Sequence, residues 1–256
     1  MFIPIKDYNP TRRFCFVTLA IIVINILVFL FQSFYFPAPT GQQGIISPLT
    51  YHIYSRGMIP REITSGKPVF IRFPVAVKDA FGNRVGVREY VLKREVNPFL
   101  SIFNSLFMHG SLLHLLGNML FLWIFGNNIE DRLGPLIFLL FYLVCGAGAA
   151  LIHLLFNWNS QIPVIGASGA VSGVMGAYLI LFPRAQVKTL VFIFFFITFV
   201  DIPAGVFLVV WFIFQLINIG SASHIAWFAH VGGFLLGAFL IRQIIKKTPP
   251  ITEIIE

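Results

Sequence analysis

Charged residues are scarce in this chain: they make up 11% of its 256 residues, whereas 57% are hydrophobic. Together with several apolar runs of helical length, this scarcity excludes an ordinary soluble domain and indicates a polytopic helical membrane protein. The net charge of +8 comes from Lys and Arg that gather near the two ends and in one long connection. Because basic and aromatic residues do not interleave as they do where bases stack, we expect no nucleic-acid partner.

Cysteine and intramembrane acids are also nearly absent. Cys15 and Cys145 both fall inside predicted spans, which argues against a disulfide framework and a cysteine metal site. No H-E-x-x-H sequence occurs, which argues against a zinc metalloprotease. Asp201 is the only acid well inside an apolar run, so an aspartyl mechanism lacks its second carboxylate. We therefore expect neither a metal nor any other cofactor.

The apolar runs predict an all-α membrane bundle of six spans. A span needs about 20 helical residues to cross about 30 Å of hydrocarbon. The first run is longer than the roughly 7–15 apolar residues of a signal peptide. No small-residue cleavage site follows it, so we interpret it as a retained span. The six predicted spans are residues 14–36, 111–126, 136–156, 167–182, 203–219 and 224–241.

The connections between the spans differ in length and charge. Residues 37–99 form a long first external loop that holds nine of the eighteen Lys and Arg residues. Rough alternation of apolar residues around Phe81-Gly82-Asn83 predicts a β-hairpin within this loop. The polar residues after the second span predict a short turn. Residues 187–200 are few for a crossing, so we interpret them as interfacial or re-entrant.

Six spans place both termini on one side of the membrane. Short loops rich in Lys and Arg face the cytoplasm, and such residues flank both termini and the turns after the second and fourth spans. Residues 157–164 and 220–223 hold no Lys or Arg and are expected outside. The predicted organisation is a cytoplasmic N-terminus, a membrane domain and a cytoplasmic tail, at residues 1–13, 14–245 and 246–256.

A stretch of small residues, GASGAVSGVMGA, opens the fourth span at Gly166. Gly169, Gly173 and Ala177 recur every four residues, so they share one helical face and let a neighbouring backbone approach closely. Ser168 falls in the first turn, where N–H groups lack intrahelical partners and the helix dipole is positive. A hydroxyl in this place is either a packing serine or a nucleophile whose oxyanion meets free N–H donors.

Polar side chains on three spans fall at one depth. Intramembrane ionisable residues are costly and are therefore functional candidates. His114 and Asn118, at i and i+4 near the outer end of the second span, share a face. His230 lies about 10 Å below the start of the sixth span. A seven-span count would put His230 near the opposite surface from Ser168. Of the other histidines, His109 is expected to be structural or solvated, His153 to be a polar tether near the outer end of the third span, and His224 to be interfacial.

These groups predict acyl transfer by a Ser–His pair, with a packing role for His230 as the alternative. Ser168 would attack a carbonyl, and His230 would take its proton and return it to the leaving amine. The side chains of His114 and Asn118 can donate hydrogen bonds to the oxyanion. We expect a dyad, because the nearest acids belong to the cytoplasmic side: Glu130, Asp131 and Asp201.

The three motifs together resemble the rhomboid family of intramembrane serine proteases, over nearly the whole chain. The family's G-x-S-G appears at 166–169, its H-x-x-x-N at 114–118, and its A-H-x-x-G-x-x-x-G at 229–237. The resemblance implies an endopeptidase that cuts transmembrane protein substrates within the lipid bilayer. It also implies a Ser168–His230 dyad with His114 and Asn118 at the oxyanion. The opening IPIKDYNPTRR is similar to prokaryotic members with a six-span core, which implies the prokaryotic cytoplasmic membrane, with the active site opening to the outer face.

Two departures from the family pattern leave questions for the structure. Some members carry an aromatic residue four positions after the nucleophile, where it stacks on the histidine, but Ser172 stands here. Some members have a Trp-Arg pair in the first loop, and this loop has none. A non-catalytic relative that binds membrane clients is the alternative function, although such proteins usually lack the serine or the histidine. A transporter would show paired interrupted helices in two matching halves, which this sequence lacks.

Overall fold

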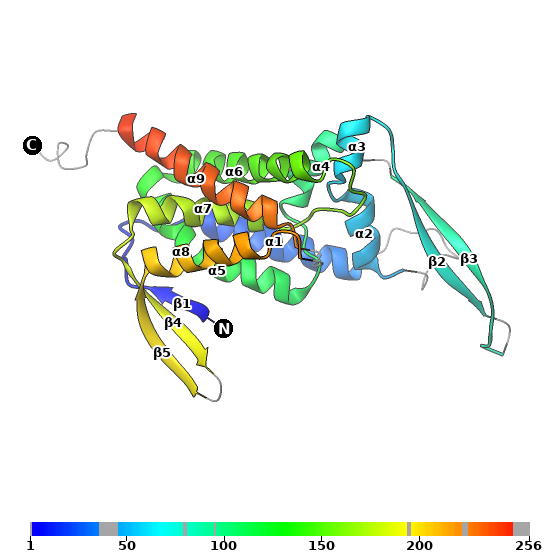
Figure 1. The fold of residues 1–256 in the computed structure, drawn as a ribbon, viewed down its shortest axis with the longest axis horizontal. Helices are drawn as coiled ribbons and strands as arrows, with labels where there is room; N and C mark the ends of the chain where they lie inside the picture. The colour runs from blue at the N-terminus through cyan, green and yellow to red at the C-terminus, as the bar shows by residue number, and fades with distance from the viewer. Residues whose placement is uncertain are drawn as a thin grey trace, which may run out of the picture.

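The computed structural model describes residues 2–35, 46–78, 81–94, 96–193, 196–221 and 225–247. Figure 1 shows long helices packed side by side, with a small β-sheet projecting near each end of the bundle. One sheet has the strand order β1-β4-β5 and the other is the β2-β3 hairpin. The elements are β1 (Phe2–Asp7), α1 (Phe16–Phe34), α2 (Pro48–Arg56), α3 (Pro60–Ser65), β2 (Phe70–Lys78), β3 (Arg84–Lys93), α4 (Pro98–Ser105), α5 (Leu112–Leu133), α6 (Pro135–Phe156), α7 (Ser168–Leu181), β4 (Gln186–Ile193), β5 (Phe196–Pro203), α8 (Ala204–Ile217) and α9 (Trp227–Lys247).

Within the described residues, four helices are long and apolar enough to cross a membrane: α1, α5, α6 and α9. These helices and the two shorter apolar ones, α7 and α8, lie where the sequence predicts six spans. Each of the shorter two has 14 residues, which is about 21 Å of helix against about 30 Å of hydrocarbon. The start of the predicted sixth span, at His224, falls outside the described residues. The chain is thus an integral membrane helical bundle.

The polar residues after the predicted second span are helical, so the predicted turn is wrong. Helix α5 continues through them and ends only at Gly134, where φ is 78° and α6 follows directly. Their polarity serves contacts with the N-terminal segment. The buried Glu130 carboxylate accepts hydrogen bonds from the N–H groups of Val17 and Thr18, at 2.9 and 2.6 Å. It thereby caps the first turn of α1, whose N–H groups have no intrahelical partner.

The second correction concerns β4 and β5, which the all-α prediction omits. These strands pair antiparallel from Gln186↔Pro203 to Ile193↔Phe196, and β1 pairs with β4. The interpretation of residues 187–200 as interfacial or re-entrant therefore did not foresee a sheet. Val, Ile, Thr and Phe dominate this stretch and favour strands. Its unbroken apolar run lacks the alternation that distinguishes a strand from a buried helix.

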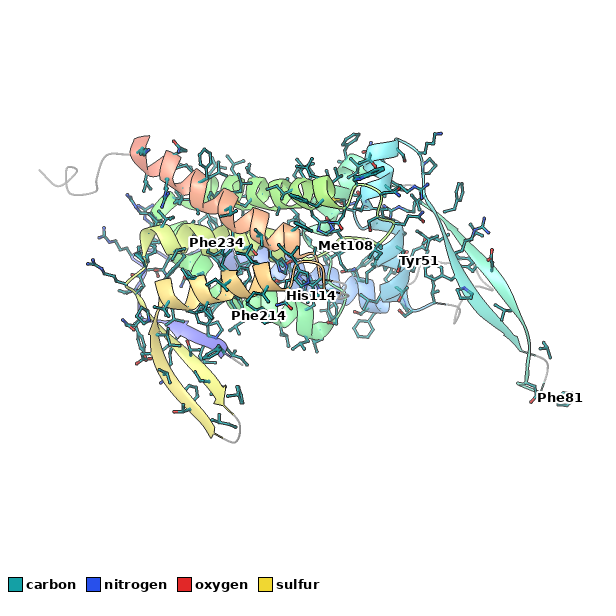
Figure 2. All side chains as sticks on the ribbon, viewed as in Figure 1. Tyr51, Phe81, Met108, His114, Phe214 and Phe234 are labelled. Atoms are coloured by element: carbon teal, nitrogen blue, oxygen red, sulfur yellow. The ribbon has the colours of Figure 1, made fainter. Side chains whose placement is uncertain are left out.

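The predicted hairpin in the long first loop is confirmed. Strands β2 and β3 pair antiparallel, and Gly82 adopts φ 86° in the connecting turn, a value that glycine reaches without strain. Figure 2 shows Phe81 at the far tip of this hairpin. At its base, the buried Arg94 guanidinium donates to the Glu62 carboxylate at 2.8 Å and to the carbonyl oxygen of Gly57. The loop thus has a folded core of its own, although residues 36–45 lie outside the described part.

Helices α7 and α9 pack backbone against backbone. A Cβ atom built on Gly233 would overlap the carbonyl oxygen of Gly169, and one on Gly237 would overlap that of Gly173. The predicted small-residue face on α7 is therefore confirmed, and it packs against Gly233 and Gly237 of α9. Only glycine permits this separation, and the close approach brings the first turn of α9 beside the first turn of α7.

Candidate active site

Helix α7 begins at Ser168, beside a cavity of about 870 Å³. Gly166 precedes the helix with φ 122°, a conformation that side chains disfavour. A Cβ atom on Gly166 would also come within 2.8 Å of the His114 ring. Glycine at this position therefore lets the chain enter α7 while the imidazole of His114 lies against the backbone. Ala167, the residue before the helix, has no polar side chain to cap the first turn.

Ser168 and His230 are in hydrogen-bond contact. The Nε2 atom of His230, in the first turn of α9, lies 2.8 Å from the Ser168 hydroxyl oxygen. When Nε2 carries no hydrogen, the hydroxyl donates to it. A hydroxyl bonded to an imidazole at 2.6–3.2 Å is the arrangement of a nucleophile and its general base.

A third side chain, which the sequence analysis missed, contacts the same imidazole. Gln215 on α8 is buried, and its Oε1 atom lies 2.9 Å from Nδ1 of His230. Its Nε2 atom donates to the Trp211 carbonyl oxygen at 3.2 Å. The sequence held one signal for this residue: it is an amide inside an apolar helix, where an unpaired polar group is costly.

Two tryptophan rings flank His230. The centroids of Trp211 and Trp227 lie 6.2 and 6.0 Å from the imidazole centroid, the first tilted and the second edge-on. Ser172, which replaces the aromatic residue of some family members, instead donates its hydroxyl to the Ser168 carbonyl oxygen at 2.6 Å. The aromatic rings beside His230 therefore come from α8 and α9, and not from the position on α7 four residues after Ser168.

His114 and Asn118 line the same cavity from α5, as their shared face predicts. The Ser111 hydroxyl accepts a hydrogen bond from the His114 N–H at 3.1 Å and so caps the helix that carries both side chains. Figure 2 shows His114 among the helices of the bundle. With Nε2 of His109 as acceptor, Asn118 donates one amide hydrogen to it at 3.0 Å. The second amide hydrogen of Asn118 remains for a group in the cavity.

The remaining histidines of the sequence analysis have different surroundings. His109 is fully buried and contacts the His114 ring edge-on at 5.0 Å, so its role is structural and not solvated. His153 on α6 lines the cavity, and its Nδ1 has no hydrogen-bond partner within the described ranges, so this atom makes no tether. His224 lies outside the described residues. Among the residues that the structure describes, no group of three or more His, Cys, Asp or Glu side chains is placed to hold a metal.

The four predicted site residues thus line one cavity. A hydroxyl at a helix N-terminus contacts an imidazole, and imidazole and amide donors lie on the facing helix. Nucleophilic acyl transfer requires this combination of nucleophile, base and oxyanion donors.

Comparison with known proteins agrees with the motifs. Residues 97–247 match the family model described as "Rhomboid domain". The chain is 30% identical over 175 residues to "Rhomboid protein 1, mitochondrial" of Saccharomyces cerevisiae, covering 63% of this chain and 48% of that protein. It is 34% identical over 146 residues to "RHOMBOID-like protein 1" of Arabidopsis thaliana, covering 55% and 34%. It is 39% identical over 72 residues to "Rhomboid protease GluP" of Bacillus subtilis, covering 28% and 14%. The matches span about half or less of the length of these relatives.

Proposed function

Because this chain belongs to the rhomboid family, we propose that it is an intramembrane serine endopeptidase. Its substrates are membrane proteins, and it hydrolyses peptide bonds in or near their transmembrane helices. Ser168 is the nucleophile and His230 the general base. The observation that carries this proposal is the 2.8 Å contact between the Ser168 hydroxyl and Nε2 of His230, beside a cavity of about 870 Å³.

The reaction follows from the positions of these groups. The Ser168 oxygen attacks the scissile carbonyl carbon while Nε2 of His230 takes the hydroxyl proton. The resulting oxyanion accepts hydrogen bonds from the side chains of His114 and Asn118 and from N–H groups at the start of α7. The imidazolium then gives its proton to the amine nitrogen as the C–N bond breaks. Water, deprotonated by His230, attacks the acyl-enzyme ester, and the imidazolium returns the proton to the Ser168 oxygen as the ester C–O bond breaks.

The depth of the site fits hydrolysis inside a membrane. Helix α7 is about 21 Å long and the hydrocarbon layer is about 30 Å thick. If the carboxyl-terminal end of α7 lies at one surface of this layer, Ser168 at its other end lies about 9 Å below the opposite surface. Water must then reach it through a polar cavity, and the irregular backbone at 157–167 is tolerated only where it lines such a cavity. A substrate helix must unwind there, because its carbonyl groups are otherwise hydrogen-bonded, so Gly or Pro near the cut should help.

The proposed topology has six spans with both termini in the cytoplasm and the active site opening to the outer face. The placement of β1 and the end of α9 at the same end of the bundle supports the even number of spans (Figure 1). The organisation into residues 1–13, 14–245 and 246–256 is part of this proposal. The opening residues favour a prokaryotic cytoplasmic membrane, whereas the name of the yeast relative points to a mitochondrial one.

The alternative is a non-catalytic relative that binds membrane clients. It would need neither a serine nor a histidine at these positions, yet both are present and hydrogen-bonded to each other. The contact therefore favours hydrolysis over binding alone.

Cleavage of a single-span substrate in liposomes tests this function. The substrate carries a Gly-Pro pair near the outer end of its transmembrane helix, and a matched control carries Leu-Leu instead. We expect the wild-type protein to produce two fragments whose masses place the cut near the Gly-Pro pair, and to cut the control more slowly. Preincubation with a fluorophosphonate should block cleavage. Stable binding of a panel of substrates without any cleavage would instead support the client-binding alternative.

A further inference from the structure

The imidazole of His230 can act as a base toward Ser168 only if its hydrogen is on the other nitrogen. We propose that Gln215 is the positioning residue that ensures this: its side-chain oxygen holds the Nδ1 hydrogen of His230 and keeps Nε2 free to accept from Ser168. This inference rests on the proposed function and adds a third side chain to the Ser–His pair. The motifs in the sequence give no indication of it.

The two ends of the Gln215 amide are distinguished by their surroundings. Its Nε2 atom donates to the Trp211 carbonyl oxygen at 3.2 Å. The opposite end of the amide, which faces Nδ1 of His230 at 2.9 Å, is therefore the oxygen. If the amide were rotated by about 180°, its NH₂ group would face the imidazole and its oxygen would face the Trp211 carbonyl oxygen. The hydrogen bond to Trp211 would then be lost, and the two oxygens would repel each other.

The orientation of the amide determines the tautomer of His230. An amide oxygen accepts and cannot donate, so Nδ1 must carry the hydrogen. The neutral ring then has its lone pair on Nε2, which lies 2.8 Å from the Ser168 oxygen. In the opposite tautomer, two lone pairs would face each other at Gln215, and the ring would offer Ser168 a hydrogen instead of a lone pair.

An amide suits this place better than the carboxylate of a Ser-His-Asp triad. A buried carboxylate in an apolar helix is costly, whereas the amide contributes the same acceptor without a charge. In triads, replacing the acid by an amide lowers kcat about 10⁴-fold, because the wrong tautomer results. Here the Trp211 carbonyl removes that difficulty, since it holds the amide nitrogen away from His230.

The surroundings of Gln215 also restrict its motion. The residue is 3% exposed and belongs to α8, the helix that carries Trp211 as well. The rings of Trp211 and Trp227 flank the imidazole that Gln215 contacts. The imidazole plane and its tautomer are therefore set together by α8 and the start of α9.

The test compares Gln215→Met with Asn218→Leu. Methionine keeps the length of the side chain but replaces the amide oxygen by a thioether sulfur, which is only a weak acceptor for the Nδ1 hydrogen. Asn218, the residue after α8, is a matched control, because its amide likewise donates to a carbonyl oxygen four residues back, that of Phe214, at 2.7 Å. We expect Gln215→Met to lower kcat roughly 100-fold, the lower end of what general base catalysis contributes, with KM and the thermal midpoint within the range of the control. A kcat within twofold of the control overturns the inference and leaves the proposed function intact. Full activity of Ser168→Ala would instead overturn the proposed function.

A second measurement keeps the inference testable if Gln215→Met fails to fold. Nitrogen-15 spectra of the histidine-labelled wild-type protein report which ring nitrogen of His230 carries the hydrogen, and a His230→Asn sample assigns the signals. We expect hydrogen on Nδ1 and a lone pair on Nε2 in the resting enzyme. Hydrogen on Nε2 would overturn the inference regardless of any cleavage data.

Discussion

Ser168→Ala and His230→Ala are each expected to lower kcat by about 10⁴-fold or more, because nucleophile and base act as one unit. For the same reason, the double variant should be no slower than the slower single variant. Initial rates of substrate cleavage in liposomes at saturating substrate measure the effect. The thermal midpoint of each variant should remain close to that of the wild type.

Ser33→Ala is the control for these variants. The Ser33 hydroxyl on α1 donates a hydrogen bond to the carbonyl oxygen of Phe29 at 2.8 Å. The substitution therefore removes a hydrogen-bonded serine hydroxyl from a different span. Its rate should match the wild type. If the fold decrease in kcat of the double variant equalled the product of the two single decreases, Ser168 and His230 would act independently, which would contradict the proposed pair.

The second large effect is expected at the contact between α7 and α9. Gly237→Leu places a side chain where the carbonyl oxygen of Gly173 lies, so the two helices must separate. A displacement of about 1 Å at a reacting group costs about 10²-fold in rate, and overpacking costs about 1–3 kcal/mol of stability. We therefore expect kcat to fall by 10²-fold or more and the thermal midpoint to fall with it. Gly237→Ala should lie between the wild type and Gly237→Leu.

Gly86→Leu provides the control for this contact. In the described part of the structure, a Cβ atom on Gly86 in β3 meets no heavy atom within 4 Å, so leucine has open space there. It should leave both kcat and the thermal midpoint unchanged. Wild-type kcat in Gly237→Leu would mean that the separation of α7 and α9 does not set the Ser168–His230 contact.

The reacting groups could be predicted from the sequence because each belongs to a short local motif. His114 and Asn118 stand four residues apart and therefore share a helical face. Likewise, the small residues on α7 recur at helical spacing, so a face that admits a neighbouring backbone follows from the sequence alone. The positions of the long helices follow from hydrophobicity and length.

Long-range pairing explains what the sequence did not predict. Gln215 belongs to no motif, and its role depends on which side chain of another helix it meets. The polar end of α5 resembles a turn until Glu130 is seen to cap α1, more than a hundred residues away in the chain. The β4-β5 hairpin was not predicted because its apolar run shows neither the alternation of a half-buried strand nor the roughly 3.6-residue spacing of an amphipathic helix.

The most direct test of the central claim is to locate the residue that a fluorophosphonate modifies in the full chain in liposomes. Peptide mapping by mass spectrometry identifies the modified serine in the wild-type protein and in His230→Ala. We predict one adduct, on Ser168, in the wild type, and its loss in His230→Ala, because the hydroxyl needs the imidazole to become nucleophilic. An adduct on a different serine, or equal modification of Ser168 in both proteins, would contradict the assignment of Ser168 as nucleophile and His230 as its base.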